Sequence, residues 1–161
     1  MSQRVTEYTY EDIPKDAHIK WISIDPEFKV LNEIKSLKIT EEKKEFSLRN
    51  ILTNQLKSSK TVFEKIQAAH IIRDKQYLDK YVISNLQEVV VSKNNDSFYA
   101  VSAEAANTLG SYNDKSDYNK SDKAYQALKM CFNIQTLSGL TPQVRRAVVT
   151  SIGGIWKKKN N

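Results

Sequence analysis

Residues 101–110 read VSAEAANTLG, and related fragments occur twice more in the chain, EKIQAAHII at 64–72 and VRRAVVTSIG at 144–153. Laid together, the fragments place a pair of small or β-branched residues three positions before an aliphatic residue. The pairs are Ala68–Ala69, Ala105–Ala106 and Val148–Val149, and the aliphatic residues are Ile72, Leu109 and Ile152. The step from Ala68 to Ala105 is 37 residues and that from Ala105 to Val148 is 43. Both match the period of about 40 residues in two-helix solenoid repeats.

Small residues in these slots have a physical role, because stacked helical pairs need close backbone approach and alanine permits it without weakening the helix. A glycine closes two of the fragments, at Gly110 and Gly153. The alternative is chance similarity, since alanine is common in helices of every kind. The joint recurrence favours three repeats, about the number that a stable stack requires. We therefore predict a mainly α fold, a HEAT-like α-solenoid of about three helical hairpins.

Start signals mark several helices around these fragments. Ser47 is predicted to cap a first helix over residues 47–58, and Thr61 with Glu64 forms a capping box that starts the second. Thr141 followed by Pro142 supplies an N-cap and a first-turn proline for the sixth.

The other three helices follow from periodicity and from their stops. A third is predicted over about 76–92, and a fourth is capped by Asp96 or Ser97 and stops at Gly110. A fifth is predicted over about 117–133. Its inner face is expected to carry Ala124, Leu128 and Phe132.

The N-terminal part has a different period. Residues 4–10 and 18–24 alternate in character and are rich in β-branched and aromatic residues, and residues 28–31 form a third extended candidate. A small antiparallel sheet with exposed edges is marginal unless a neighbour completes it. The predicted domains are a β-strand segment at 1–35 that forms an incomplete β-sandwich, a linker at 36–46 and a HEAT-like helical repeat domain at 47–161.

Composition limits the class of protein. A chain of 161 residues with 40% hydrophobic residues can bury the core of one domain, and only 4 Gly and 3 Pro favour helices over many tight turns. No apolar run is long enough for an export signal or a membrane span. The single cysteine, Cys131, lies in an apolar run and is predicted to be a buried thiol. We expect a soluble, cytoplasmic protein without a membrane partner.

The net charge of +6 makes acidic partners possible. Most lysines alternate with acidic residues. Cations are concentrated in the last helix and at the C-terminus, which gives a candidate basic interaction patch, Arg145, Arg146, Lys157, Lys158 and Lys159. Several cations on one face can bind nucleic-acid phosphates. The simpler interpretation is a solvated helix end that is stabilised by the helix dipole.

No catalytic motif is present. The only histidines, His18 and His70, are too far apart in sequence to form a recognisable zinc pair, and Gly153–Gly154 is a helix end rather than a phosphate loop. Residues 114–122 lack the glycine and final glutamate of a calcium loop. The sequence therefore predicts no catalytic residues, metal ligands or cofactor, and His70 is expected to be an ordinary partly buried or surface residue.

A family resemblance begins at residues 21–36, WISIDPEFKVLNEIKS. This segment is similar to the join between the small β-sandwich and the C-terminal helical domain of aminopeptidase-N-type zinc aminopeptidases. The residues that carry the match are Trp21, Asp25, Pro26, Val30 and Leu31, with Asn32 where a lysine is frequent. VFEKIQAAHII and SFYAVSAEAANTLG look like the HEAT-like repeats that follow in that family.

The family's catalytic H-E-x-x-H motif and its GxMEN exopeptidase signature are missing from this chain. The resemblance therefore implies the non-catalytic C-terminal tail of such a peptidase, which acts with a separate zinc aminopeptidase catalytic chain as its protein partner. In the family, the corresponding helical domain covers the catalytic cleft. We expect a helical-repeat scaffold or docking module, and the alternative is a basic HEAT-like module that binds nucleic acid.

Overall fold

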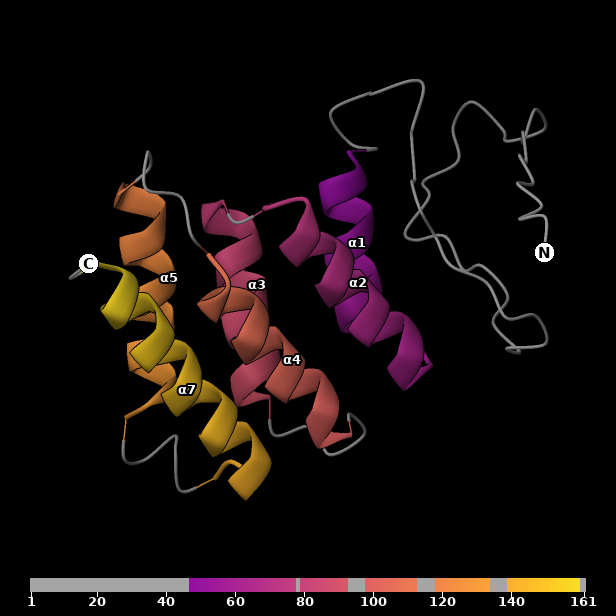
Figure 1. The fold of residues 1–161 in the computed structure, drawn as a ribbon. Helices are drawn as coiled ribbons and strands as arrows, with labels where there is room; N and C mark the ends of the chain where they lie inside the picture. Colours follow the sequence, from indigo (N-terminus) through magenta and orange to yellow (C-terminus); the bar gives the residue numbers. More distant parts are fainter. Residues whose placement is uncertain (1–46, 78, 93–97, 113–117, 134–138, 160–161) are drawn as a thin grey trace, which may run out of the picture.

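The protein was analysed as a computed structural model, which describes residues 47–77, 79–92, 98–112, 118–133 and 139–159 (Figure 1). In this part the chain forms the helices α1 (Leu48–Ser58), α2 (Val62–Asp74), α3 (Lys80–Val91), α4 (Tyr99–Gly110), α5 (Tyr118–Cys131) and α7 (Pro142–Lys159). The prediction of a mainly helical fold is confirmed for these residues. The predicted strands, the β-strand segment 1–35 and the linker 36–46 lie outside the described residues.

Three helices begin at the predicted caps. The hydroxyl of Ser47 accepts a hydrogen bond from the backbone N–H of Asn50, and that of Thr61 accepts one from Glu64, each at 3.3 Å. The Thr141 hydroxyl lies 3.5 Å from the N–H of Val144. Each bond satisfies one of the N–H groups that the first turn of a helix leaves without an intrahelical partner.

The predicted start of the third helix at residue 76 is wrong. Gln76 has a positive φ of 54° and ends the turn after α2, so the chain cannot continue as a helix there. Helix α3 begins at Lys80 instead, because the Asp79 carboxylate accepts hydrogen bonds from the N–H groups of Tyr81 and Val82 at 2.8 and 3.0 Å. A local cap therefore overrides the apolar periodicity of the preceding residues.

Helix α4 starts without a side-chain cap, since Phe98 occupies the N-cap position and makes no capping hydrogen bond. The expected caps, Asp96 and Ser97, lie outside the described residues. At the end of α5, Ala124 and Leu128 are buried as predicted, but Phe132 is 45% exposed. Phe132 follows the last helical residue, so its side chain no longer points with the inner face.

The described helices pack in two layers (Figure 1). Helices α2, α4 and α7 lie side by side in one layer, and α1, α3 and α5 contact one another in succession in the other. Each helix also contacts its neighbour along the chain in the opposite layer, which gives the pairs α1–α2, α3–α4 and α5–α7. The largest fully buried side chains are Leu52, Leu56, Ile72, Leu86, Leu109, Leu128, Ile155, Val82, Val90, Val101 and Val148. Each contributes roughly 1.5–3 kcal/mol by leaving water.

Helix α4 ends at Gly110 as predicted, but the reason for the glycine differs from the expected helix stop. No described glycine has a positive φ, so Gly110 is not a left-handed C-terminal residue. A Cβ at Gly110 would lie 2.4 Å from the Cβ of Ser151 and 2.8 Å from its Cα. The glycine is therefore required for the close approach of α4 and α7.

Candidate functional site

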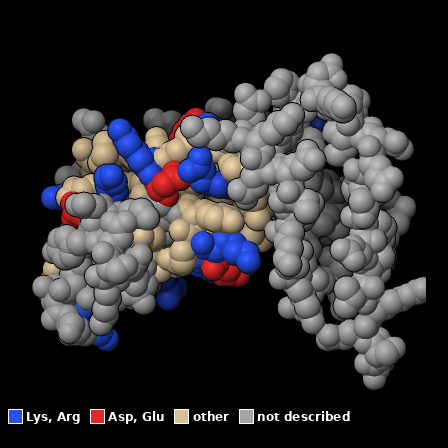
Figure 2. Space-filling model, turned by 90° about the horizontal axis from the view of Figure 1, so that it is seen from above, with Lys and Arg blue, Asp and Glu red and all other residues tan. Residues whose placement is uncertain are grey.

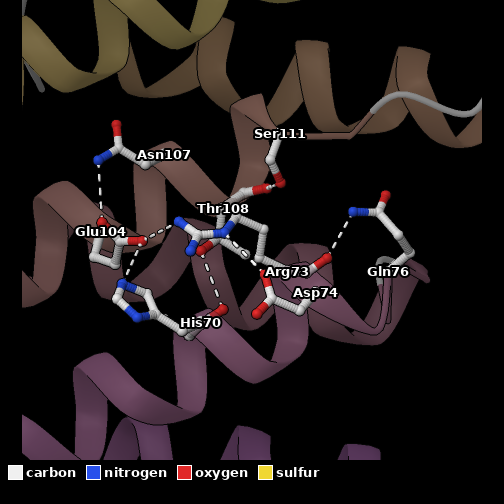
Figure 3. A network of polar contacts seen from close by, with 9 residues as sticks. His70, Arg73, Asp74, Gln76, Glu104, Asn107, Thr108 and Ser111 are labelled. Atoms are coloured by element: carbon white, nitrogen blue, oxygen red, sulfur yellow. Dashed lines mark hydrogen bonds and ion pairs between the residues drawn. The ribbon is translucent and has the colours of Figure 1, made fainter.

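A polar cluster joins α2 to α4 on one side of their layer (Figure 3). The carboxylate of Glu104 on α4 lies 2.6 Å from the Arg73 guanidinium and 2.9 Å from Nε2 of His70, both on α2. The amide of Asn107 donates to the other carboxylate oxygen at 3.2 Å. Glu104 is only 16% exposed, and these donors compensate its partial removal from water.

A second contact strengthens the same junction from the inside. The Thr108 hydroxyl donates to the backbone carbonyl of Ala69 at 3.3 Å, and both residues are buried. Since the donors and acceptors of this junction satisfy one another, the cluster fits a structural link between helices. His70 is half-buried and bound to Glu104, in keeping with the ordinary role expected for it.

The basic residues predicted as an interaction patch all lie on α7. Arg145 is half-buried, whereas Arg146 and Lys157 are exposed. Lys158 and Lys159 form the end of the helix, and their side chains lie outside the described part. Arg146 and Lys157 are eleven residues apart. At 1.5 Å per residue they are separated by roughly 16 Å along the axis, so the cations form two groups near the two ends of the helix.

Charges of both signs occur together elsewhere on the surface. Figure 2 shows Lys and Arg side chains beside Asp and Glu on the visible part of the described surface. Lys57 on α1, for example, lies 2.8 Å from Glu88 on α3. By contrast, the sequence of α7 contains five cations and no carboxylate. This helix is therefore the strongest candidate for contact with an acidic partner.

The exposed side of α7 also carries apolar surface. Val149 is 50% exposed, Trp156 is 61% exposed, and a Cβ added at Gly153 would meet nothing within 4 Å. The three residues follow the i, i+4, i+7 spacing of one helix face. We call Val149, Gly153 and Trp156 the open edge of α7. The sequence pattern placed Val149 and Gly153 in repeat slots but did not predict their exposure. The expected helix end at Gly153–Gly154 is wrong, because α7 continues to Lys159.

The described residues contain neither a metal-ligand cluster nor an exposed thiol. Among them, no group of three or more His, Cys, Asp and Glu side chains could hold a metal ion. Cys131 is buried, as predicted, and burial raises the pKa of its thiol from 9.0 to about 11. A thiol in this state is a poor nucleophile near neutral pH.

Comparison of the chain with protein-family models, with curated proteins and with solved structures finds no match. None of the helices in the described part is both long enough and apolar enough to cross a membrane.

Proposed function

We propose that this chain is a non-catalytic helical-repeat scaffold of the HEAT-like kind, on which a protein partner docks. The observation that carries the proposal is the packing of α2, α4 and α7 in one layer, since these helices contain the three related fragments found in the sequence. In such stacks each repeat contacts only its neighbours, and the stack presents an extended concave surface on which partners can bind.

The resemblance at residues 21–36 supports a more specific form of this proposal. In that form the chain is the C-terminal part of an aminopeptidase-N-like metallopeptidase and acts with a separate catalytic chain. The chain would then limit access to the catalytic cleft, and the predicted strands would complete a β-sandwich with the partner.

The first test is affinity purification of the chain from its native lysate, with the bound polypeptides identified by mass spectrometry and assayed for aminopeptidase activity. A specific partner with an H-E-x-x-H motif is the expected result for the split peptidase. A specific partner without that motif would support the scaffold and reject the peptidase relation. Recovery of nucleic acid with no specific protein would reject both.

A basic module that binds nucleic acid is the second candidate, because α7 carries five cations and no carboxylate. Fluorescence anisotropy with a labelled 20-nucleotide duplex tests it directly. If phosphate contacts drive binding, the logarithm of affinity falls linearly with the logarithm of salt concentration, and Arg146→Gln or Lys157→Gln each reduces that slope by about 1. Binding without this salt dependence would reject the second candidate.

A further inference from the structure

Helix α4 has a different neighbour on each side within its layer. On one side the Thr108 hydroxyl donates to the carbonyl of Ala69 on α2. On the other side Gly110 lies against Ser151 of α7. Between these sides, the Ser102 hydroxyl donates to the Val89 carbonyl of α3, at 3.0 Å. The helix therefore uses separate, identifiable positions for the preceding helix, the following helix and the opposite layer.

The same positions recur in α7. The step of 43 residues that relates Ala105 to Val148 also relates Thr108 to Ser151 and Gly110 to Gly153. Ser151 does face the preceding helix, α4, as Thr108 faces α2. Gly153 therefore occupies the position that would meet a following helix, and the space beside it is open.

A second pair of equivalent residues in α4 and α7 also differs in whether another helix covers it. Ala106 on α4 is fully buried, whereas its counterpart Val149 on α7 is 50% exposed. Both are followed four residues later by the glycines compared above. The open edge of α7 thus reproduces a helix-packing surface that α4 uses internally, at a place where the described structure supplies no helix to cover it.

The positive charges beside the open edge favour an acidic helix as the partner. Arg146 lies seven residues before Gly153 and Lys157 lies four residues after it, so both share the side of the helix that Gly153 occupies. Both side chains are exposed. Two copies of the edge packed together would bring like charges into contact, which is unfavourable. Acidic side chains beside the apolar stripe of an incoming helix would be attracted instead.

We propose that the open edge of α7 is a docking site for an acidic amphipathic helix of a partner protein, which packs across Gly153 in the place of a further repeat. This inference rests on the scaffold function proposed above and names the partner's chemistry. Val149 and Trp156 contact the apolar stripe of the partner helix, and Arg146 and Lys157 face its carboxylates.

The probe for this site is derived from the helix that covers the equivalent edge of α4, which is α7 itself. A synthetic peptide of residues 142–159 has its five cations replaced by Glu, Gly153 and Gly154 by Ala, and Trp156 by Leu. It keeps the buried stripe of α7, Val144, Val148, Ser151 and Ile155. A second peptide with the same changes retains the cations and serves as the control for charge.

Binding is measured with the full chain carrying Trp21→Phe, so that Trp156 is the only remaining tryptophan of the two. We expect the acidic peptide to shift Trp156 emission to shorter wavelength as the indole leaves water, and the affinity to fall as salt is added. The cationic peptide should bind at least about ten-fold more weakly. Equal binding of the two peptides, or none at millimolar concentration, would overturn the proposal.

Two matched variants separate this site from the rest of the surface. Gly153→Gln places a side chain on the open edge, whereas Gly154→Gln points about 100° away around the helix. Neither Cβ would meet an atom within 4 Å, so both variants should fold. We expect Gly153→Gln to weaken binding about ten-fold or more and Gly154→Gln to change it less than about two-fold. Similar losses in both variants would contradict the assignment.

The same variants distinguish failure of this site from failure of the scaffold function. If a specific lysate partner is retained equally by the unsubstituted chain and by Gly153→Gln, the scaffold stands and the docking site lies elsewhere. If sedimentation shows that the unsubstituted chain is a dimer and that Gly153→Gln is not, the open edge binds a second copy of the chain rather than an acidic helix of a partner. If neither form retains a protein partner, the scaffold function itself fails.

Discussion

The two junctions within the layer of α2, α4 and α7 are built differently. At the first, Arg73 of α2 reaches Glu104 of α4. The equivalent position 37 residues later is Gly110, which lies directly against Ser151 of α7. A repeat position can therefore be filled by a charged side chain or by no side chain at all. The first junction combines polar contacts at a partly exposed rim with the buried bond from Thr108 to Ala69, and the second depends on close backbone approach.

A third use of that repeat position occurs at Gly153, where no atom lies within 4 Å of an added Cβ. The comparison predicts that identical substitutions will have different effects at equivalent positions. The change in the free energy of unfolding should depend on which residues cover the position rather than on the local sequence.

The largest contrast is expected at the aliphatic slot. Leu109 is fully buried in α4, and its counterpart Ile152 is half-buried in α7. We expect Leu109→Ala to lower the free energy of unfolding by about 3 kcal/mol, because it leaves a cavity between the layers, and Ile152→Ala to lower it by about 1 kcal/mol. Urea unfolding followed by circular dichroism measures both. Equal losses would show that α7 is packed as tightly as α4.

The next contrast concerns the two glycines and includes a change of sign. Gly110→Ala forces α4 and α7 apart and should cost about 2 kcal/mol, since overpacking outweighs the gain in helix propensity. Gly153→Ala should stabilise the chain by about 0.5–1 kcal/mol, because alanine is the better helix former and the space is open. A stabilising Gly110→Ala would disprove the close contact.

The polar junction should respond more weakly. Glu104→Gln removes the charge that faces Arg73 and His70, and we expect a loss of about 1 kcal/mol that shrinks as salt is added. The matched control is Glu88→Gln, whose carboxylate is 64% exposed beside Lys57 and should contribute only a few tenths of a kcal/mol. Equal effects of the two variants would mean that burial of Glu104 does not strengthen its pairing.

The smallest expected effect concerns the Cys131 thiol on α5, in the last helical pair, α5 and α7. Because burial raises the pKa of Cys131 to about 11, the native thiol remains protonated at pH 8 and should react with a thiol reagent only when α5 opens. Since that pKa lies above its unfolded value of 9.0, the associated stability is complete below pH 9 and is lost as the pH rises towards 11. Labelling rates across urea concentrations measure the opening, and rapid labelling of the native chain would contradict it. Cys131→Ala should remove the part of the stability loss between pH 9 and 11 that the thiol contributes.

Several features were predictable because they depend on residues close in sequence. The caps Ser47, Thr61 and Thr141 act on N–H groups three residues away, so a short motif is sufficient to locate them. The start of α3 was missed although Asp79 is a favoured N-cap residue, because the apolar periodicity runs on before it and the left-handed backbone at Gln76 leaves no clear sequence signal. The basic residues could be located in the sequence, but only the structure places all of them on the single helix α7.

The sequence by itself determined that the described part is helical and which residues recur at intervals of 37 and 43. Only the tertiary structure decided what those residues do. Ala106 and Val149 occupy equivalent slots, as do Gly110 and Gly153, yet one member of each pair is covered and the other is open. A helical period reports which residues share a face. Whether that face meets another helix depends on the neighbours supplied by distant parts of the chain.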